Sequence, residues 1–378
     1  MDTGMMQARY KRAVVKVGSN VLTKGDGSLD LEAMQRIVDQ IAGLMRLGME
    51  VILVSSGAVA SGKSVISGHR RLDAVSARQL YSSVGQARLI NSYCELFSRH
   101  GIICGQVLTT KESLSTRDHY LNQMNCMDTM LGNGVIPVVN ENDTISVTEL
   151  MFTDNDELSG MVASMMDAGC LVILSNVDGI YDGPPGNPSS EIIPEVRPGE
   201  NISGCIASGK SSFGRGGMLT KYRIATKVAD EGIEVVIANG KQEGILYGVL
   251  TDREGPVRCT RFLPSERPIS HIKKWIAHSD GFAKGEIRIN EGAYRALTGT
   301  RASSLLPVGV TSVSGEFEKG DIVKIIAPDG HTAGVGKVSA GSAKAAESIG
   351  QKGRKPLIHY DYLYIEFTES PEDIQGTR

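Results

Sequence analysis

The sequence has no long apolar run, no large surplus of one charge and few aromatic residues. No segment approaches the roughly 18 apolar residues of a membrane-spanning helix, and the N-terminal residues contain no apolar leader core. We therefore expect a soluble, cytoplasmic protein that does not associate with membranes. Lys and Arg number 40 against 43 Asp and Glu, a net charge of −3, and there is one Trp. This balance disfavours a protein that binds nucleic acid along its whole length.

The six cysteines are scattered, and none belongs to a CxxC pair. Zinc sites and disulfide frameworks both show characteristic cysteine spacings, so neither is indicated here. Because disulfides are rare in the cytosol, we expect free thiols in a reducing compartment.

Glycine, by contrast, is abundant, with 44 among 378 residues, whereas an average protein has about 7%. The 13 prolines and the absence of a Gly-X-Y period exclude collagen and low-complexity disorder. The length exceeds what one hydrophobic core usually supports, so we expect two domains.

Short β-branched runs alternate with longer helical patterns over the first 240 residues. The expected strands are 13–17, 51–54, 102–108, 135–139, 171–174 and 235–238. The expected helices are 31–47, 74–99, 117–131, 158–168 and 218–231. Continuously apolar strands separated by helices indicate a parallel sheet covered on both faces. We therefore predict an α/β fold, a three-layer αβα sandwich with a mainly parallel sheet, whose ligands bind beyond the carboxyl ends of the strands.

The pattern changes near residue 255, where a proline-containing stretch, 255–270, is typical of a linker. The segments that follow are short strands with turn signals and little helix: EIRIN, SSLLPVGVTSV, GDIVKIIAPDG and LYIEF. We predict a first domain at 1–262, a linker at 263–274 and a small β-rich domain at 275–378. Residues 271–378 hold 14 Lys and Arg against 13 Asp and Glu, too little excess to indicate nucleic-acid binding.

Two segments match the phosphate-binding pattern GxxxxGK[ST], at 57–64 and 204–211. The pattern binds phosphate only where a strand leads into the loop and a helix leaves it. The first match follows a strand, but the segment SGHRR that comes after it, with Gly68, does not favour the required helix. The second match has no strand before it, and no apolar strand ends in an Asp that could hold a nucleotide-bound metal. We therefore reject a P-loop fold.

Polar and glycine-rich segments fall where the predicted strands end. Lys16 lies inside the first strand and needs an anionic partner if it is buried; an edge strand would instead let it face solvent. Ser56 and Gly57 follow the second strand and would let backbone N–H groups approach an anion, although an ordinary turn explains them too. Residues 140–143 (NEND) suit a small charged substrate, with Asx-type turn chemistry as the alternative.

Two further segments carry charge near expected helix starts. Residues 154–156 (DND) precede the helix expected near residue 158. A helix cap explains only one of them, and two acids flanking an amide suit a substrate ammonium or the orientation of lysines. The segment 213–221, FGRGGMLTK, enters a helix with glycines that allow a turn around phosphate and with Lys221 in its first turn. Two lysines from distant segments, together with glycine N–H groups, meet the needs of phosphoryl transfer.

These motifs resemble the amino acid kinase family, in which VVKVGSN, VSSGAVASG, VVNENDT, DNDELS and RGGMLTK occur in this order. The NEND and DNDxLS blocks resemble the members that phosphorylate L-glutamate, and the region from about Trp275 resembles a PUA domain. The resemblance implies ATP-dependent phosphorylation of the γ-carboxylate of L-glutamate to L-glutamyl 5-phosphate, with Mg²⁺, as the first step of proline biosynthesis. It also implies a homo-oligomer, dimer or tetramer, and feedback inhibition by proline.

The resemblance assigns roles residue by residue. Lys16 and Lys221 would stabilise the transferring phosphoryl group, and Asp156 would hold both lysines in position. The residues expected around glutamate are Ser56, Gly57, Asn140, Asp143, Asp154 and Asn155. The residues expected around ATP are Lys16, Gly18, Ser175, Asn176, Arg215, Gly216, Gly217, Met218 and Lys221. No protein ligand for the metal is identified, and no general base is required because a carboxylate is already a nucleophile at neutral pH.

Two departures from the family pattern fall in the nucleotide half of the site. Arg215 stands where the family usually has a small hydroxyl residue, and Ser175 with Asn176 stands where it usually has Thr-Asp. The glutamate contacts are therefore better indicated than the ATP contacts. The alternatives are a related phosphotransferase acting on another carboxylate or on a phosphate acceptor, and an RNA-binding PUA protein.

Overall fold

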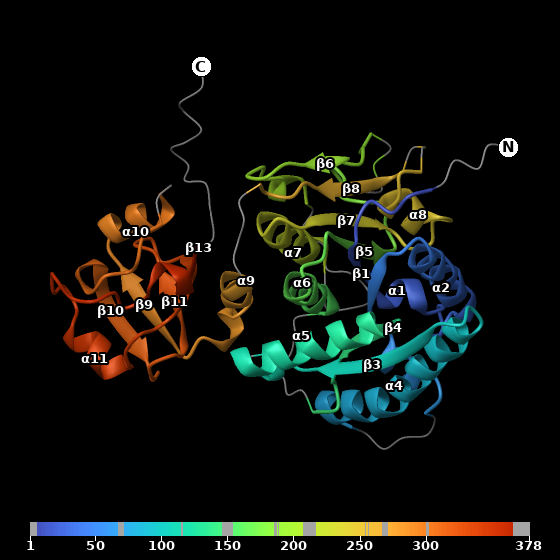
Figure 1. The fold of residues 1–378 in the computed structure, drawn as a ribbon, viewed down its shortest axis with the longest axis horizontal. Helices are drawn as coiled ribbons and strands as arrows, with labels where there is room; N and C mark the ends of the chain where they lie inside the picture. Colours follow the sequence, from blue (N-terminus) through green and yellow to red (C-terminus); the bar gives the residue numbers. More distant parts are fainter. Residues whose placement is uncertain are drawn as a thin grey trace. The chain divides into compact units, whose positions relative to one another are not determined.

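The computed structural model describes residues 6–66, 72–114, 116–145, 154–184, 187, 189–206, 217–253, 255, 257–266, 271–299 and 302–365. The chain divides into two compact units, Met1–Pro268 and Ile269–Arg378 (Figure 1). Each unit has a hydrophobic core of its own.

The first unit is built on an eight-stranded sheet in the order β3-β4-β2-β1-β5-β7-β8-β6. The strands are β1 (Arg12–Val17), β2 (Glu50–Ser55), β3 (Ile103–Thr109), β4 (Val135–Glu141), β5 (Cys170–Ser175), β6 (Glu195–Val196), β7 (Glu234–Asn239) and β8 (Cys259–Phe262). Only β7 and β8 pair in antiparallel fashion; the other neighbours are parallel. The predicted, mainly parallel sheet is confirmed.

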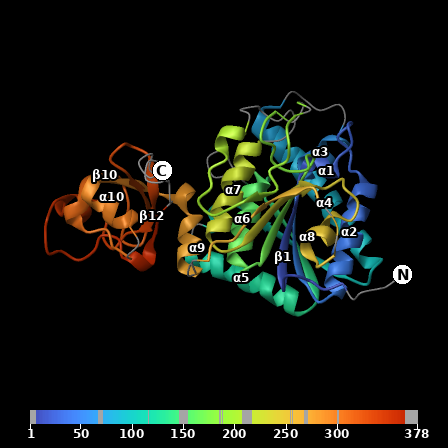
Figure 2. The same ribbon diagram turned by 90° about the horizontal axis from the view of Figure 1, so that it is seen from above.

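Helices lie on both faces of this sheet (Figure 2). They are α1 (Ser19–Leu22), α2 (Leu31–Arg46), α3 (Ala58–Lys63), α4 (Ala74–Ser98), α5 (Arg117–Gly132), α6 (Asn155–Met165), α7 (Met218–Asp230) and α8 (Ile245–Leu250), with single 3-10 turns at Glu112–Leu114 and Ser203–Cys205. Apolar side chains of α2, α4 and α8 form the core on one face, while α6 and α7 lie on the other (Figure 2). The predicted three-layer αβα arrangement is therefore also confirmed.

Two elements differ from their predictions. The helix expected from residue 158 begins at Asn155, because Asp154 caps it through its side chain. β8 lies inside the stretch 255–270 that reads as a linker. The linker prediction is wrong for Cys259–Phe262, which forms a strand that pairs with β7. Its sequence has only two apolar residues and prolines nearby, so it carries little strand signal. Thr260 of β8 is fully buried, and its Oγ1 accepts a hydrogen bond from the Ile180 backbone N–H at 2.8 Å.

Two glycines let α3 approach α4 closely. A Cβ on Gly62 would lie 1.8 Å from the Tyr81 carbonyl oxygen, and one on Gly85 would lie 1.7 Å from that of Ala58. Any side chain at either position would push the helices apart. Gly62 belongs to the GAVASGKS segment, so this glycine serves helix packing. The short α3, six residues long, agrees with the rejection of a P-loop.

The second unit has a five-stranded sheet in the order β10-β9-β11-β12-β13. The strands are β9 (Gly285–Ile289), β10 (Val310–Gly315), β11 (Ile322–Ile326), β12 (Thr332–Lys337) and β13 (Leu363–Ile365), and only β9 and β11 pair in parallel. The helices are α9 (His271–Ala277), α10 (Glu291–Thr298) and α11 (Ser342–Glu347), with 3-10 turns at Asp280–Phe282, Pro307–Gly309 and Tyr360–Tyr362. The β-rich character is confirmed, although α9 begins inside the expected linker 263–274. β12 was not predicted, because TAGVGK contains two glycines, which strands disfavour.

Within the described part of the chain, no helix has the length and apolar character needed to cross a membrane. All six cysteines are free.

Candidate active site

The carboxyl ends of the central strands meet at one edge of the sheet. β1 lies between β2 and β5, and its last residue, Val17, is in register with Ser55 and Leu174. On the far side of β2, Val54 is in register with Val139, so Asn140 reaches the same edge. Parallel pairing therefore brings together segments that are up to 160 residues apart in the sequence.

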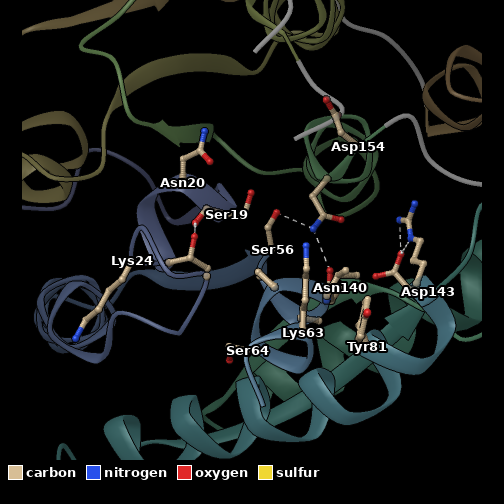
Figure 3. A pocket seen from close by; sticks show the side chains of 18 of the residues that line it. Ser19, Asn20, Lys24, Ser56, Lys63, Ser64, Tyr81, Asn140, Asp143 and Asp154 are labelled. Atoms are coloured by element: carbon tan, nitrogen blue, oxygen red, sulfur yellow. Dashed lines mark hydrogen bonds and ion pairs between the residues drawn. The ribbon is translucent and has the colours of Figure 1, made fainter. Parts of the chain in front are cut away.

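A pocket of about 1060 Å³ opens at this edge (Figure 3). The predicted site residues in its lining are Ser56, Gly57, Asn140, Asp143, Asp154, Asn155 and Asn176. All the residues predicted to surround the acceptor thus line one cavity. Gly57 adopts a φ of +102°, which glycine reaches without strain, and it directly precedes α3.

Lys16 and Lys221 share one carboxylate beside this pocket. The odd-numbered residues of β1 pack into the core under α2, α4 and α8, so Lys16 faces the opposite side, where α6 packs against β1. There Lys16 Nζ forms an ion pair with Asp156 Oδ1, and Lys221 Nζ donates to Asp156 Oδ2 at 2.8 Å. The side chain of Asp156 is 1% exposed. β1 is central in the sheet, so the edge-strand alternative for Lys16 is wrong.

The two ammonium groups keep Asp156 ionised. Burial acts to raise the pKa of its carboxyl, but the charges of Lys16 and Lys221 outweigh burial and lower the pKa to about 2. These three side chains together carry one net positive charge, and the neighbouring carboxyl of Asp154 also interacts with both lysines. The two ammonium groups share one carboxylate, so each can still donate to a bound anion.

Asp154 is a buried carboxyl with one oxygen committed to the fold. Its Oδ1 accepts hydrogen bonds from the backbone N–H groups of Asp156 and Glu157 at 2.9 and 3.1 Å, capping α6. Its Oδ2 has no hydrogen-bond partner among the described residues. Burial, together with repulsion from Asp156, raises the pKa of Asp154 to about 6. The helix cap thus accounts for Oδ1 of Asp154, and it does not account for Oδ2.

Asn155 connects the second and fourth strands at their carboxyl ends. Its Nδ2 lies within hydrogen-bond distance of Ser56 Oγ at 2.9 Å, Asn140 Oδ1 at 3.0 Å and the Ser55 carbonyl oxygen at 3.1 Å (Figure 3). The amide of Asn140 is fixed in turn, because its Nδ2 donates to Gln86 Oε1 at 2.7 Å. These contacts hold three of the predicted acceptor-binding side chains in fixed positions.

Arg78 holds Asp143, the remaining predicted acceptor residue. Arg78 Nε donates to Asp143 Oδ1 at 2.7 Å, and its NH2 group lies 3.3 Å from Glu141 Oε2. Neither Arg78 nor Gln86 is among the site residues predicted from the sequence. They are eight residues apart on α4 and so share one helical face, a spacing that could have identified both once α4 was placed beside the pocket.

Most of the predicted nucleotide residues are among the described residues and lie at the ends of β1 and β5 and at the start of α7. A Cβ on Gly18 would lie 3.3 Å from the Leu174 carbonyl oxygen and 3.7 Å from Lys16 Nζ, so Gly18 lies directly beside that ammonium group. Ser175 ends β5 and is largely buried, whereas Asn176 lines the pocket. Gly217 directly precedes α7, which begins at Met218. Arg215 and Gly216 lie outside the described residues.

In the described part of the chain, no group of three or more His, Cys, Asp or Glu side chains is arranged to hold a metal ion.

Comparison of the sequence with models of known protein families identifies both units. Residues 11–239 match the model of the Amino acid kinase family, and residues 285–360 match that of the PUA domain. The chain therefore belongs to the amino acid kinase family, and this prediction from the sequence is confirmed.

Three relatives are similar over almost their whole length, and all three are named glutamate 5-kinase. The protein of Bacteroides thetaiotaomicron is 61% identical over 361 residues, 96% of this chain and 100% of its own. That of Chlorobaculum tepidum is 49% identical, over 94% of this chain and 98% of its own. That of Trichlorobacter lovleyi is 38% identical, over 96% of each chain.

Proposed function

We propose that the protein transfers the γ-phosphoryl group of ATP to the γ-carboxylate of L-glutamate, giving L-glutamyl 5-phosphate. The observation that carries the proposal is the pair of buried lysines on one carboxylate, next to a pocket lined by acids and amides. The similarity to three glutamate 5-kinases along the whole chain supports glutamate as the acceptor.

The reaction requires positioning and charge neutralisation more than proton transfer. A γ-carboxylate oxygen attacks the γ-phosphorus, a new P–O bond forms, and the bond to the β,γ-bridging oxygen breaks to release ADP. Lys16 and Lys221 donate hydrogen bonds to the phosphoryl oxygens as charge moves to the leaving ADP. Asp156 keeps both ammonium groups in place and charged. No side chain needs to remove a proton, because the carboxylate is ionised at neutral pH.

The pocket provides complementary groups for glutamate. The carboxylates of Asp143 and Asp154, two residues that line the pocket, suit the substrate ammonium. Ser56, Gly57, Asn140 and Asn155 line the same pocket and offer hydroxyl, amide and backbone groups. We place the γ-carboxylate at the lysine end and the amino-acid end toward α3 and α4.

ATP fits the side of the cluster formed by Gly18, Ser175 and Asn176, with its phosphates at the start of α7. The N-terminus of this 13-residue helix is preceded by Gly217 and has no side-chain cap, so its N–H groups are available to phosphate oxygens. Met218 and Lys221 belong to the same turn. The described residues do not form a metal site, so Mg²⁺ would arrive bound to the ATP phosphates.

The same proposal includes four expectations, about the protein's pathway, location, assembly and regulation. The reaction is the first step of proline biosynthesis and takes place in the cytoplasm. The enzyme is a homo-oligomer, a dimer or a tetramer, and proline inhibits it as the end product. Size-exclusion chromatography with light scattering tests the oligomer, and a proline titration of the activity tests the inhibition.

Hydroxylamine trapping tests the proposed acceptor directly. The protein is incubated with ATP, Mg²⁺, hydroxylamine and one acid at a time: glutamate, aspartate, N-acetylglutamate or carbamate. Glutamate should give the hydroxamate at the highest kcat/KM, because its γ-carboxylate reaches the lysines while its ammonium reaches the acids. Hydroxamate from another acid and none from glutamate would refute glutamate as the acceptor. A reaction without ATP is the control for uncatalysed hydroxamate formation.

A further inference from the structure

The proposed function leaves one charged group of the substrate without a partner. Glutamate carries an ammonium group and two carboxylates, and the γ-carboxylate occupies the lysine cluster. The α-carboxylate therefore needs a cation or several N–H donors at the opposite end of the pocket, since removing a charge from water without a partner is costly. The described cationic residues that line the pocket are Lys24, Lys63, Arg78 and Lys241.

Three of these four residues are poorly placed for the α-carboxylate. Arg78 already pairs with two acids, Asp143 and Glu141. Lys24 points away from Ser56 and Asn140 (Figure 3). Lys241 follows Gly240, whose N–H donates to the Ser175 carbonyl oxygen at 2.8 Å, and this places Lys241 on the nucleotide side.

Lys63 has the required position. It is the last residue of α3 and is exposed, and its side chain extends from that helix into the pocket, in the direction of Ser56 and Asn140 (Figure 3). No ion pair joins it to another described residue. α3 is held firmly, because Gly62 and Gly85 allow the helix to pack directly on the backbone of α4. The base of Lys63 is thus fixed, while its ammonium group is available to a ligand.

We propose that Lys63 binds the α-carboxylate of the acceptor amino acid and so selects acids that carry this group. The inference rests on the proposed function, because it concerns the other end of the same substrate. With Asp143 and Asp154 on the ammonium and Lys63 on the α-carboxylate, both charges of the amino-acid end are matched. Lys63 belongs to the GAVASGKS segment, whose lysine would then serve a carboxylate rather than a nucleotide phosphate.

L-Isoglutamine, the α-amide of glutamate, isolates this contact. It keeps the γ-carboxylate and the ammonium group but has a neutral amide in place of the α-carboxylate. The hydroxamate assay gives kcat/KM for both acids with the wild type and with Lys63→Met. The wild type should prefer glutamate by about tenfold or more, the scale of one charge-assisted hydrogen bond. Lys63→Met should lose most of this preference through a higher KM for glutamate, and Lys63→Arg should restore part of it.

Lys24→Met is the matched control, since it removes the same charge from the same pocket. It should leave the ratio of the two kcat/KM values unchanged. Because Lys63 is exposed, thermal unfolding should show that Lys63→Met folds like the wild type. Undiminished preference for glutamate in Lys63→Met, or an equal loss of preference in Lys24→Met, would overturn the role of Lys63 and leave the proposed function standing. Failure of the wild type to act on glutamate would instead overturn the proposed function, and this inference with it.

Discussion

Replacing Asp156 by Asn tests the lysine cluster by removing its single negative charge. The substitution keeps the shape of the side chain but removes the carboxylate that pairs directly with both Lys16 and Lys221. Their side chains are 6% and 11% exposed, so water cannot take over the role of the carboxylate. Removing one partner of a buried ion pair costs about 3–5 kcal/mol, and here two pairs depend on one carboxylate. We expect the free energy of unfolding to fall by at least this amount at pH 7.

The pH dependence of this loss follows from the pKa of Asp156. Its pKa in the folded protein, about 2, lies below the ordinary value of 3.8. The stabilisation is therefore fully present above about pH 5 and disappears as the pH falls through 2. The difference in unfolding free energy between wild type and Asp156→Asn should follow the same course.

Urea unfolding of the full chain, followed by far-UV circular dichroism, measures the loss. Hydrogen–deuterium exchange of the β1 and α6 amides assigns it to the first unit. Lys16→Met in the Asp156→Asn background removes one of the two unpaired cations, so the double variant should lose less stability than the sum of the single variants. A loss below about 1 kcal/mol for Asp156→Asn, with kcat within threefold of wild type, would refute the cluster's role in both stability and catalysis.

Three further substitutions separate the parts of the site. Lys221→Ala should lower kcat by about a hundredfold or more with little change in the glutamate KM, because its ammonium group acts on the transferring phosphoryl group; steady-state kinetics with an unimpaired kcat would contradict this. Asp154→Asn should weaken glutamate binding at pH 8. In the wild type kcat/KM should fall as the pH drops through about 6, where Asp154 becomes protonated, and Asp154→Asn should abolish this fall. If kcat/KM of the variant still falls near pH 6, another group is responsible. Arg78→Met should raise the glutamate KM about tenfold with kcat nearly unchanged, because Asp143 loses the donor that orients it. Arg78→Lys should recover part of the affinity for glutamate. An unchanged KM for Arg78→Met would contradict the orienting role of Arg78.

The sheet and its functional edge could be predicted from the sequence because they depend on local patterns. Runs such as residues 51–54 are apolar throughout, as strands buried on both faces must be. Once the sheet is parallel, the polar segments that follow those runs have to meet at one edge. This reasoning placed Ser56 and Asn140 at one edge of the sheet, where both line the pocket, whereas Asn155 was assigned through the family resemblance.

The contacts that depend on side-chain direction across long sequence distances could not be predicted from the residue pattern. The pairing of Lys16 with Asp156 requires that Lys16 face α6, which in turn depends on the strand order. Arg78 lies on a helix of low amphipathic contrast, where a charged residue is typical of a solvent-exposed face. β8 depends on its pairing with β7 rather than on its own sequence, because CTRF carries little strand signal.

The glycine-rich loop before α7 shows a different limit. Arg215 and Gly216 were predicted from the family resemblance to contact ATP, and they lie outside the described residues. Their roles stay predictions, and Arg215→Thr tests the first of them. If Arg215 contacts phosphate, this variant should raise the KM for ATP without changing the KM for glutamate. An unchanged or lower KM for ATP would contradict the contact.

The central claim, attack by the γ-carboxylate of glutamate on the γ-phosphorus of ATP, has a direct isotopic test. Glutamate labelled with ¹⁸O in its γ-carboxylate is incubated with the protein, ATP, Mg²⁺ and hydroxylamine, and the released phosphate is measured by mass spectrometry. The attacking oxygen becomes the bridge between carbon and phosphorus, and hydroxylamine then breaks the C–O bond. Each phosphate released with hydroxamate should therefore carry one ¹⁸O atom. Phosphate without ¹⁸O would show that the carboxylate never bonded to phosphorus and would contradict the claim.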